Sequence, residues 1–129
     1  MQKGFATLEV ILMVMVIGIL ASIAVPRFTD ITTSANTAKI QADLSTIDTA
    51  IAIYSMENND TPDMEKLKPY LQDADKIKPP TGKAFVNGTA TAIVATTYAI
   101  TADTVNTGGY RATLDDKTAG QFTKKTSST

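Results

Sequence analysis

The chain carries, at residues 4–26, the stretch GFATLEVILMVMVIGILASIAVP. From Phe5 to Val25 it has one charge, on Glu9, and residues 10–25 have none. As an α-helix, this segment would be about 31 Å long, which is enough to cross the hydrocarbon core of a bilayer. The sequence therefore predicts a membrane-spanning helix near the start of the chain.

Glu9 is the residue of this helix that needs an explanation. A carboxylate at the centre of a membrane helix costs about 2.5–3.5 kcal/mol, and it costs less towards an end. One interpretation places Glu9 a turn from the start of the helix, where an acid interacts favourably with the helix dipole and reaches the lipid headgroups. Another interpretation comes from the order of the residues around it.

The order of residues from Gly4 to Glu9, followed by the apolar run and Pro26, resembles the class III signal of type IV pilins and type II secretion pseudopilins. The resemblance covers about the first 55 residues. It implies that a prepilin peptidase cuts after Gly4, which makes residues 1–4 a leader peptide, and methylates the new amino group of Phe5. It also implies that Glu9 is the glutamate used in assembly and that Pro26 is the helix-kinking proline.

Elementary electrostatics agrees with this role for Glu9. Cleavage after Gly4 exposes a cationic amine on Phe5, and in a filament core of packed helices that charge would have no water. Glu9 of a neighbouring subunit can pair with it. Because removing one member of a buried pair is strongly destabilising, we expect the pair to set the axial register of assembly.

The resemblance implies a structural subunit of a type IV pilus or pilus-like filament, without enzymatic activity or cofactors. The implied partners are prepilin peptidase, further copies of the chain in a helical homopolymer, other pilin-like subunits and the inner-membrane assembly machinery. The precursor would be a single-pass inner-membrane protein with its leader in the cytoplasm and residues from Arg27 onward outside. It would then enter an extracellular pilus or, for a pseudopilin of a type II secretion or DNA-uptake system, a periplasmic pseudopilus.

A second alternative is an ordinary secretory signal. Ser22-Ile23-Ala24 is a small-x-small triplet after an apolar stretch, so cleavage after Ala24 would release a secreted binding module. The length of the apolar run and the charge of Glu9 inside it both count against this interpretation.

Composition bounds the rest of the chain. Of its 129 residues, about 100 lie beyond the apolar segment, which is room for one small domain. Histidine and cysteine are absent, which removes the usual general base, thiol nucleophile and transition-metal ligands. The absence of cysteine also excludes the disulfide that closes a C-terminal loop in many type IV pilins. A net charge of −1 gives no general attraction to nucleic acid.

An apolar stripe continues the helical pattern beyond Pro26. It consists of Ile40, Leu44, Ile47, Ile51 and Tyr54, which recur at steps of three and four residues. The stripe predicts an amphipathic helix over 27–58 that faces a core. The residues expected on the opposite, solvent-facing side are Lys39, Gln41, Asp43, Asp48 and Thr49.

Shorter elements follow this helix. We expect a short helix over 63–72, capped by Asp63 or Thr61, with Met64, Leu67 and Leu71 facing inward. Residues rich in Thr, Val, Ile and aromatics then predict three antiparallel strands, and a fourth if residues 121–123 pair. The predicted strands are 84–86, 91–102 and 110–114.

Together these patterns predict a pilin-like α+β fold. A long N-terminal helix, membrane-spanning in its first half and amphipathic in its second, would pack on a small antiparallel sheet. The expected organisation is a leader at 1–4, a transmembrane or filament-core helix at 5–26 and a globular domain at 27–129.

Calcium is the one metal that the sequence brings into question. Major pseudopilins carry a calcium site in their C-terminal loops, and Asp115 with Asp116, or Asp73 with Asp75, could supply oxygen ligands. The spacing of an EF-hand is missing, and no stretch resembles the Trp-Gly loop motif of those pseudopilins. Exposed aspartate pairs are usually solvated, so the sequence predicts no metal site.

Overall fold

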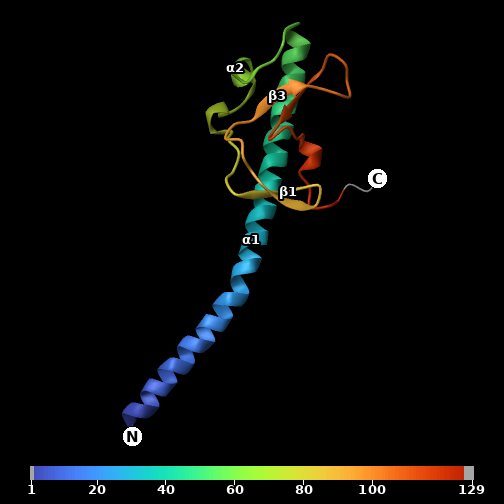
Figure 1. The fold of residues 1–129 in the computed structure, drawn as a ribbon. Coiled ribbons are helices and arrows are strands. Elements are labelled where there is room, and N and C mark those ends of the chain that lie inside the picture. The colour runs from blue at the N-terminus through green and yellow to red at the C-terminus, as the bar shows by residue number, and fades with distance from the viewer. Residues whose placement is uncertain (1, 127–129) are drawn as a thin grey trace. The chain divides into compact units, whose positions relative to one another are not determined.

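The computed structural model describes residues 2–126, and the side chains of residues 2, 3 and 24–27 lie outside that description. Its helices, 3₁₀ turns (η) and strands are, in order, α1 (Gln2–Glu57), α2 (Met64–Leu67), η1 (Lys68–Tyr70), η2 (Ala74–Lys76), β1 (Lys83–Val86), β2 (Thr89–Ala92), β3 (Ala99–Ala102), β4 (Tyr110–Thr113) and η3 (Ala119–Gln121) (Figure 1). The chain divides into two compact units, Met1–Thr32 and Thr33–Thr129, and α1 contributes to both.

In the first unit, α1 is a helix without a covering layer. Every residue from 4 to 23 is exposed, and an 18-residue window of the helix has a mean hydropathy of 2.7 with none of it buried. Within the described residues, α1 is the one helix whose length and composition suit a membrane span. The helix is assigned without interruption through position 26. The kink at Pro26 stays a prediction, and the side chain of Pro26 lies outside the described residues.

In the second unit, the predicted stripe of α1 is the centre of the core. The side chains of Ile40, Leu44 and Ile47 are completely buried. The other two residues of the stripe, Ile51 and Tyr54, are also buried. The rest of the core cluster consists of Ala50, Leu67, Leu71, Ala84, Tyr98, Ala112, Leu114 and Phe122. Apart from those of α1, these residues come from α2, β1, β4 and the connecting segments, so α1 is the element on which the rest of the fold packs.

The short helix begins as predicted and ends earlier. The Asp63 carboxylate accepts the backbone N–H of Lys66 at 2.9 Å, so Asp63 is the N-cap. The α-helix ends at Leu67 and continues as the 3₁₀ turn η1, because Pro69 has no N–H for the α-helical ladder. Leu67 and Leu71 are buried and Met64 packs beside them, as expected.

The strands form two separate hairpins rather than one sheet. β1 pairs with β2, and β3 pairs with β4, both antiparallel. The predicted single strand over 91–102 is wrong, because it contains β2, a connecting segment and β3. The backbone N–H groups of Val94 and Ala95 in that segment donate to the carboxylate of Asp115, at 3.0 and 2.8 Å, instead of to a strand.

The optional strand at residues 121–123 does not form. Ala119–Gln121 is the 3₁₀ turn η3. Its N-cap Thr118 and Gln121 form a capping box, in which each side chain accepts the backbone N–H of the other residue. This local pairing competes with strand formation.

Polar side chains of α1 attach both hairpins to the helix. Thr37 Oγ1 accepts the N–H of Phe85 in β1 at 2.7 Å. Asp48 Oδ1 accepts the N–H of Ala112 in β4 at 2.7 Å. In each case the outer edge of a strand lies against α1, and a helix side chain takes the place of a neighbouring strand.

These contacts correct the predicted solvent-facing side of α1. Asp43 accepts the hydroxyl of Tyr98 at 2.6 Å, and burial together with this bond raises the pKa of Tyr98 above its usual range. Lys39 and Gln41 donate to the backbone carbonyls of Lys78 and Phe122. Of the five residues assigned to that side, only Thr49 is exposed and bonded solely within the helix. The apolar stripe shows which side of α1 is buried in the core. Polar residues next to the stripe are not all exposed to solvent, because several of them bind the segments that pack on that side.

Replacing Leu44 with alanine should destabilise the globular unit by about 2–5 kcal/mol, the usual range for a fully buried leucine. The adjacent Ser45 is exposed, and Ser45→Ala should change the free energy of unfolding by about 0.5 kcal/mol or less. Chemical denaturation of a soluble fragment that begins at Thr29 measures both. Equal midpoints for the two variants would show that the stripe is not the core.

Candidate functional site

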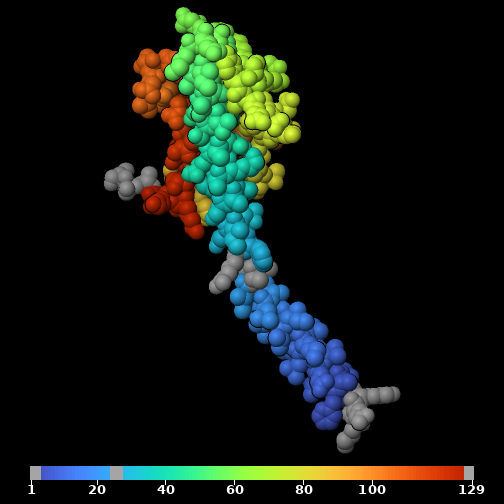
Figure 2. Space-filling model, turned by 180° about the vertical axis from the view of Figure 1, so that it is seen from behind, coloured from blue at the N-terminus to red at the C-terminus, as the bar shows by residue number. Residues whose placement is uncertain are grey.

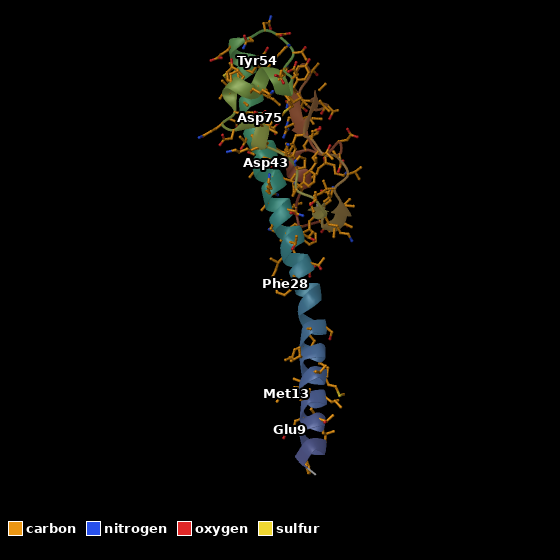
Figure 3. The ribbon with its side chains drawn as sticks, turned by 90° about the vertical axis from the view of Figure 1, so that its left-hand side faces the viewer. Glu9, Met13, Phe28, Asp43, Tyr54 and Asp75 are labelled. Atoms are coloured by element: carbon orange, nitrogen blue, oxygen red, sulfur yellow. The ribbon has the colours of Figure 1, made fainter. Side chains whose placement is uncertain are left out.

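The residues singled out by the N-terminal motif lie on the first turns of α1. Gly4, Phe5 and Glu9 are all helical and exposed, and the side chain of Phe5 is 68% exposed. Figure 3 labels Glu9 near the start of α1. A side chain added at Gly4 would meet no atom within 4 Å. No described side chain therefore covers the predicted cleavage point, and a protease has room to approach it.

Phe5 and Glu9 lie on the same side of α1, since residues four apart are neighbours on a helix surface. Among the described side chains, Glu9 has no hydrogen bond or ion pair. The carboxylate of Glu9 therefore lies close to the predicted new N-terminus and has no partner among the described residues of its own chain. It is available to bind a group of another molecule.

The other polar groups of this segment are satisfied locally. Ser22 donates its hydroxyl to the carbonyl of Ile19 at 2.7 Å, and Thr32 donates to Phe28 at 2.9 Å. Such bonds back to the preceding turn let hydroxyl side chains exist in an apolar environment. Beyond the first turn the backbone groups are bonded within the helix, so Glu9 is the side chain on residues 4–23 that most requires an external partner.

The structure gives Asp115 a role within the fold. Both oxygens of its carboxylate accept backbone N–H groups, from Val94 and Ala95. Asp115 and Asp116 have φ angles of 49° and 62°, in the tight turn closed by the bridge between Leu114 and Lys117. In the described part of the chain, no group of three or more potential metal-binding side chains comes together.

Asp73 and Asp75 do not form a common site either. The Asp73 carboxylate lies 3.8 Å from the ammonium of Lys76, and that of Asp75 lies 3.9 Å from Lys68. Each is a solvent-exposed pair at long distance, of the kind that contributes little to stability.

Sequence reasoning missed the side chains that attach the hairpins to α1. Asn36 donates to the carbonyls of Thr81 and Lys83, at 3.0 and 2.9 Å, beside the bond between Thr37 and Phe85. Asp48 likewise holds β4, by accepting the backbone N–H of Ala112. The available signal was the position of these residues immediately beside the apolar stripe, where a short polar side chain can reach the edge of a strand.

Comparison with curated proteins finds relatives of two kinds. The chain is 37% identical over 65 residues to the type IV narrow pilus major component PilA5 of Thermus thermophilus, which is 50% of this chain and 56% of that protein. It is 29% identical over 87 residues to the type II secretion system core protein G of Pectobacterium carotovorum, or 63% of this chain and 56% of the relative. For the core protein G of Klebsiella pneumoniae the identity is 30% over 78 residues, 60% of this chain and 56% of the relative.

The chain spans little more than half the length of these curated relatives. No family model and no solved structure matches it. The two kinds of relative are nevertheless the same two that the N-terminal motif resembles. They agree with the long apolar helix and the α+β unit built on its second half, and these relatives therefore support the resemblance of the chain to type IV pilins and type II secretion pseudopilins.

Proposed function

We propose that this protein is a structural subunit of a type IV pilus or pilus-like filament and that it assembles through the first part of α1. The observation that carries the proposal is the uncovered apolar surface of residues 4–23. A surface of this size is unfavourable in water and marks a contact with lipid or with other proteins. Residues 1–4 are then the leader, 5–26 the membrane or filament-core helix and 27–129 the globular domain.

The same helix surface serves two environments in turn. Before assembly it spans the inner membrane, where a helix satisfies all its backbone hydrogen bonds internally. In the filament, neighbouring copies of the helix replace the lipid. Both environments are apolar, so the transfer from one to the other needs no change in the side chains of residues 10–23.

Glu9 provides the polar contact that differs between these environments. In the membrane it lies close to the helix start, where a carboxylate reaches the headgroups. In the filament it pairs with the amine of Phe5 on a neighbouring subunit. Because a misaligned neighbour would leave both charges buried without a partner, the pair selects one axial position among many that apolar packing alone permits.

The alternatives differ in how well they account for α1. Cleavage after Ala24 would cut within this helix, which is assigned continuously to Glu57, so an ordinary signal peptide fits less well. A pseudopilin of a secretion or DNA-uptake system remains the second candidate, since core protein G is among the relatives. The use of the Asp115 carboxylate by two backbone N–H groups, and the absence of tryptophan, favour the pilus over a major pseudopilin with a calcium loop.

Gly4→Leu should leave an unprocessed precursor in the inner membrane, because a side chain at the junction obstructs the bend that the peptidase requires. Gly18→Leu is the matched control, since Gly18 is also helical and also has no atom within 4 Å of an added side chain. Mass spectrometry of the membrane fraction reads the N-terminal residue of each variant. Wild-type yield of a species that begins at Phe5 from Gly4→Leu would contradict the proposed processing.

Glu9→Val should leave cleavage and membrane insertion intact and reduce the yield of filaments at least about tenfold, because it removes one member of a buried charge pair. Thr7→Val is the control for the added hydrophobicity and should assemble normally. Immunoblots compare the membrane fraction with filaments sheared from the cells. Normal filament yield from Glu9→Val would show that Glu9 is not needed for assembly and only interacts favourably with the dipole at the start of the helix.

A further inference from the structure

The described chain ends in a segment, residues 119–126, that crosses the turn of the first hairpin. We call this segment the strap. In Figure 1 it is the red part of the chain that passes the β1–β2 hairpin. The strap comprises η3 and the residues that follow it.

Backbone carbonyl groups of the strap accept hydrogen bonds from the N–H groups of the hairpin turn. Asn87 and Gly88 form the two-residue turn between β1 and β2, with φ angles of 47° and 88°. Asn87 N–H donates to the carbonyl of Gln121 at 2.9 Å, and Gly88 N–H donates to that of Thr123 at 2.9 Å. These two N–H groups have no acceptor within the hairpin itself. The carbonyl groups of the strap accept them instead.

The strap is also attached to α1 and to the side chains of β1. The Phe122 side chain is 2% exposed and belongs to the core, and its carbonyl accepts the side-chain amide of Gln41. The ammonium of Lys124 lies 5.6 Å from the ring centroid of Phe85, within the range of a cation–π contact. One buried side chain and several polar contacts therefore hold the strap in place.

The first hairpin depends on these contacts because the second hairpin gives it no backbone support. Within residues 2–126, no backbone hydrogen bond joins the β1–β2 sheet to the β3–β4 sheet. Asn36 and Thr37 of α1 hold β1 along one edge. A two-stranded hairpin is at best marginally stable alone, so its turn needs a second attachment.

We propose that the strap fastens the β1–β2 hairpin to α1, and that strap and hairpin open together as one unit while the β3–β4 hairpin stays closed. With no cysteine in the chain, the strap performs without a covalent bond what a disulfide would do for the C-terminal region. Proteins commonly open in such contiguous units, at a free energy below that of global unfolding.

Two glycines provide a matched pair of variants. Gly88 and Gly108 have φ angles of 88° and 87°, so alanine brings similar backbone strain to either position. A Cβ at Gly88 would lie 2.7 Å from Thr126 Cγ2 and 3.1 Å from Thr126 N, in the strap, whereas one at Gly108 would meet no atom within 4 Å. Strain at Gly88 acts on the β1–β2 turn and strain at Gly108 on the connection between β3 and β4, so the contact with the strap is read from the exchange of residues 119–126.

Hydrogen–deuterium exchange of the full chain in detergent micelles, read by mass spectrometry of peptides, tests the proposal. Gly88→Ala should accelerate exchange in peptides covering 83–92 and 119–126 by about tenfold, the change expected when two ordinary hydrogen bonds are weakened. Peptides covering 99–113 should keep their wild-type rates. Gly108→Ala should leave both 83–92 and 119–126 at wild-type rates.

Three results would overturn the proposal. Faster exchange in 99–113 together with 83–92 in Gly88→Ala would show that the unit includes both hairpins. Faster exchange of the strap alone would show that the hairpin does not depend on it. Faster exchange of 83–92 in Gly88→Ala with 119–126 at the wild-type rate would show that strain in the turn, rather than loss of the strap, is responsible.

Discussion

Burial of one face of α1 is the constraint on which the globular unit depends. Ile40, Leu44 and Ile47 are removed from water completely, and side chains from α2, β1, β4 and the connecting segments cover them. Neither two-stranded sheet has a core of its own, and the α-helix α2 is only four residues long. Such short elements gain their stability from the surface on which they pack. Figure 2 shows the opposite face of α1, which the strands leave uncovered.

Polar side chains beside this apolar face decide where the short elements lie. Thr37 and Asp48 accept N–H groups from the outer edges of β1 and β4, and Asp43 accepts the hydroxyl of the buried Tyr98. Apolar packing alone is not directional, and it would permit the hairpins to slide along the helix. Hydrogen bonds at fixed positions remove that freedom, since a displaced strand would leave its edge groups without partners.

The sequence was sufficient to predict the elements that follow a simple period. The apolar run from Val10 onward and the stripe of Ile40 and Leu44 give the extent of α1 and its buried face, and both are confirmed. The number of sheets was not predictable in this way. Residues 91–102 have the composition of a strand throughout, and they are divided because Asp115, more than a dozen residues later, binds the backbone of the connecting segment.

The candidate site stays a prediction, and it could be made from the sequence because its chemistry is local. Gly4, Phe5 and Glu9 lie within six consecutive residues on one helix, so their mutual arrangement follows from helical geometry alone. Asn36 and Thr37 could not be assigned, since their partners are 45 or more positions away. Side chains that depend on long-range contacts require the folded structure.

We expect α1 to meet two environments, an apolar one on all sides of residues 10–23 and a core on one side of residues 40–54. Because the chain contains no cysteine, single cysteines introduced along α1 can be probed with a water-soluble maleimide applied to permeabilised membranes. No position from 10 to 23 should react. Beyond Ile40, cysteines at the positions of Ser45 and Thr49 should react, and those at Leu44 and Ile47 should not. A helical alternation of reactive and protected positions within residues 10–23 would show instead that one side of that segment faces water.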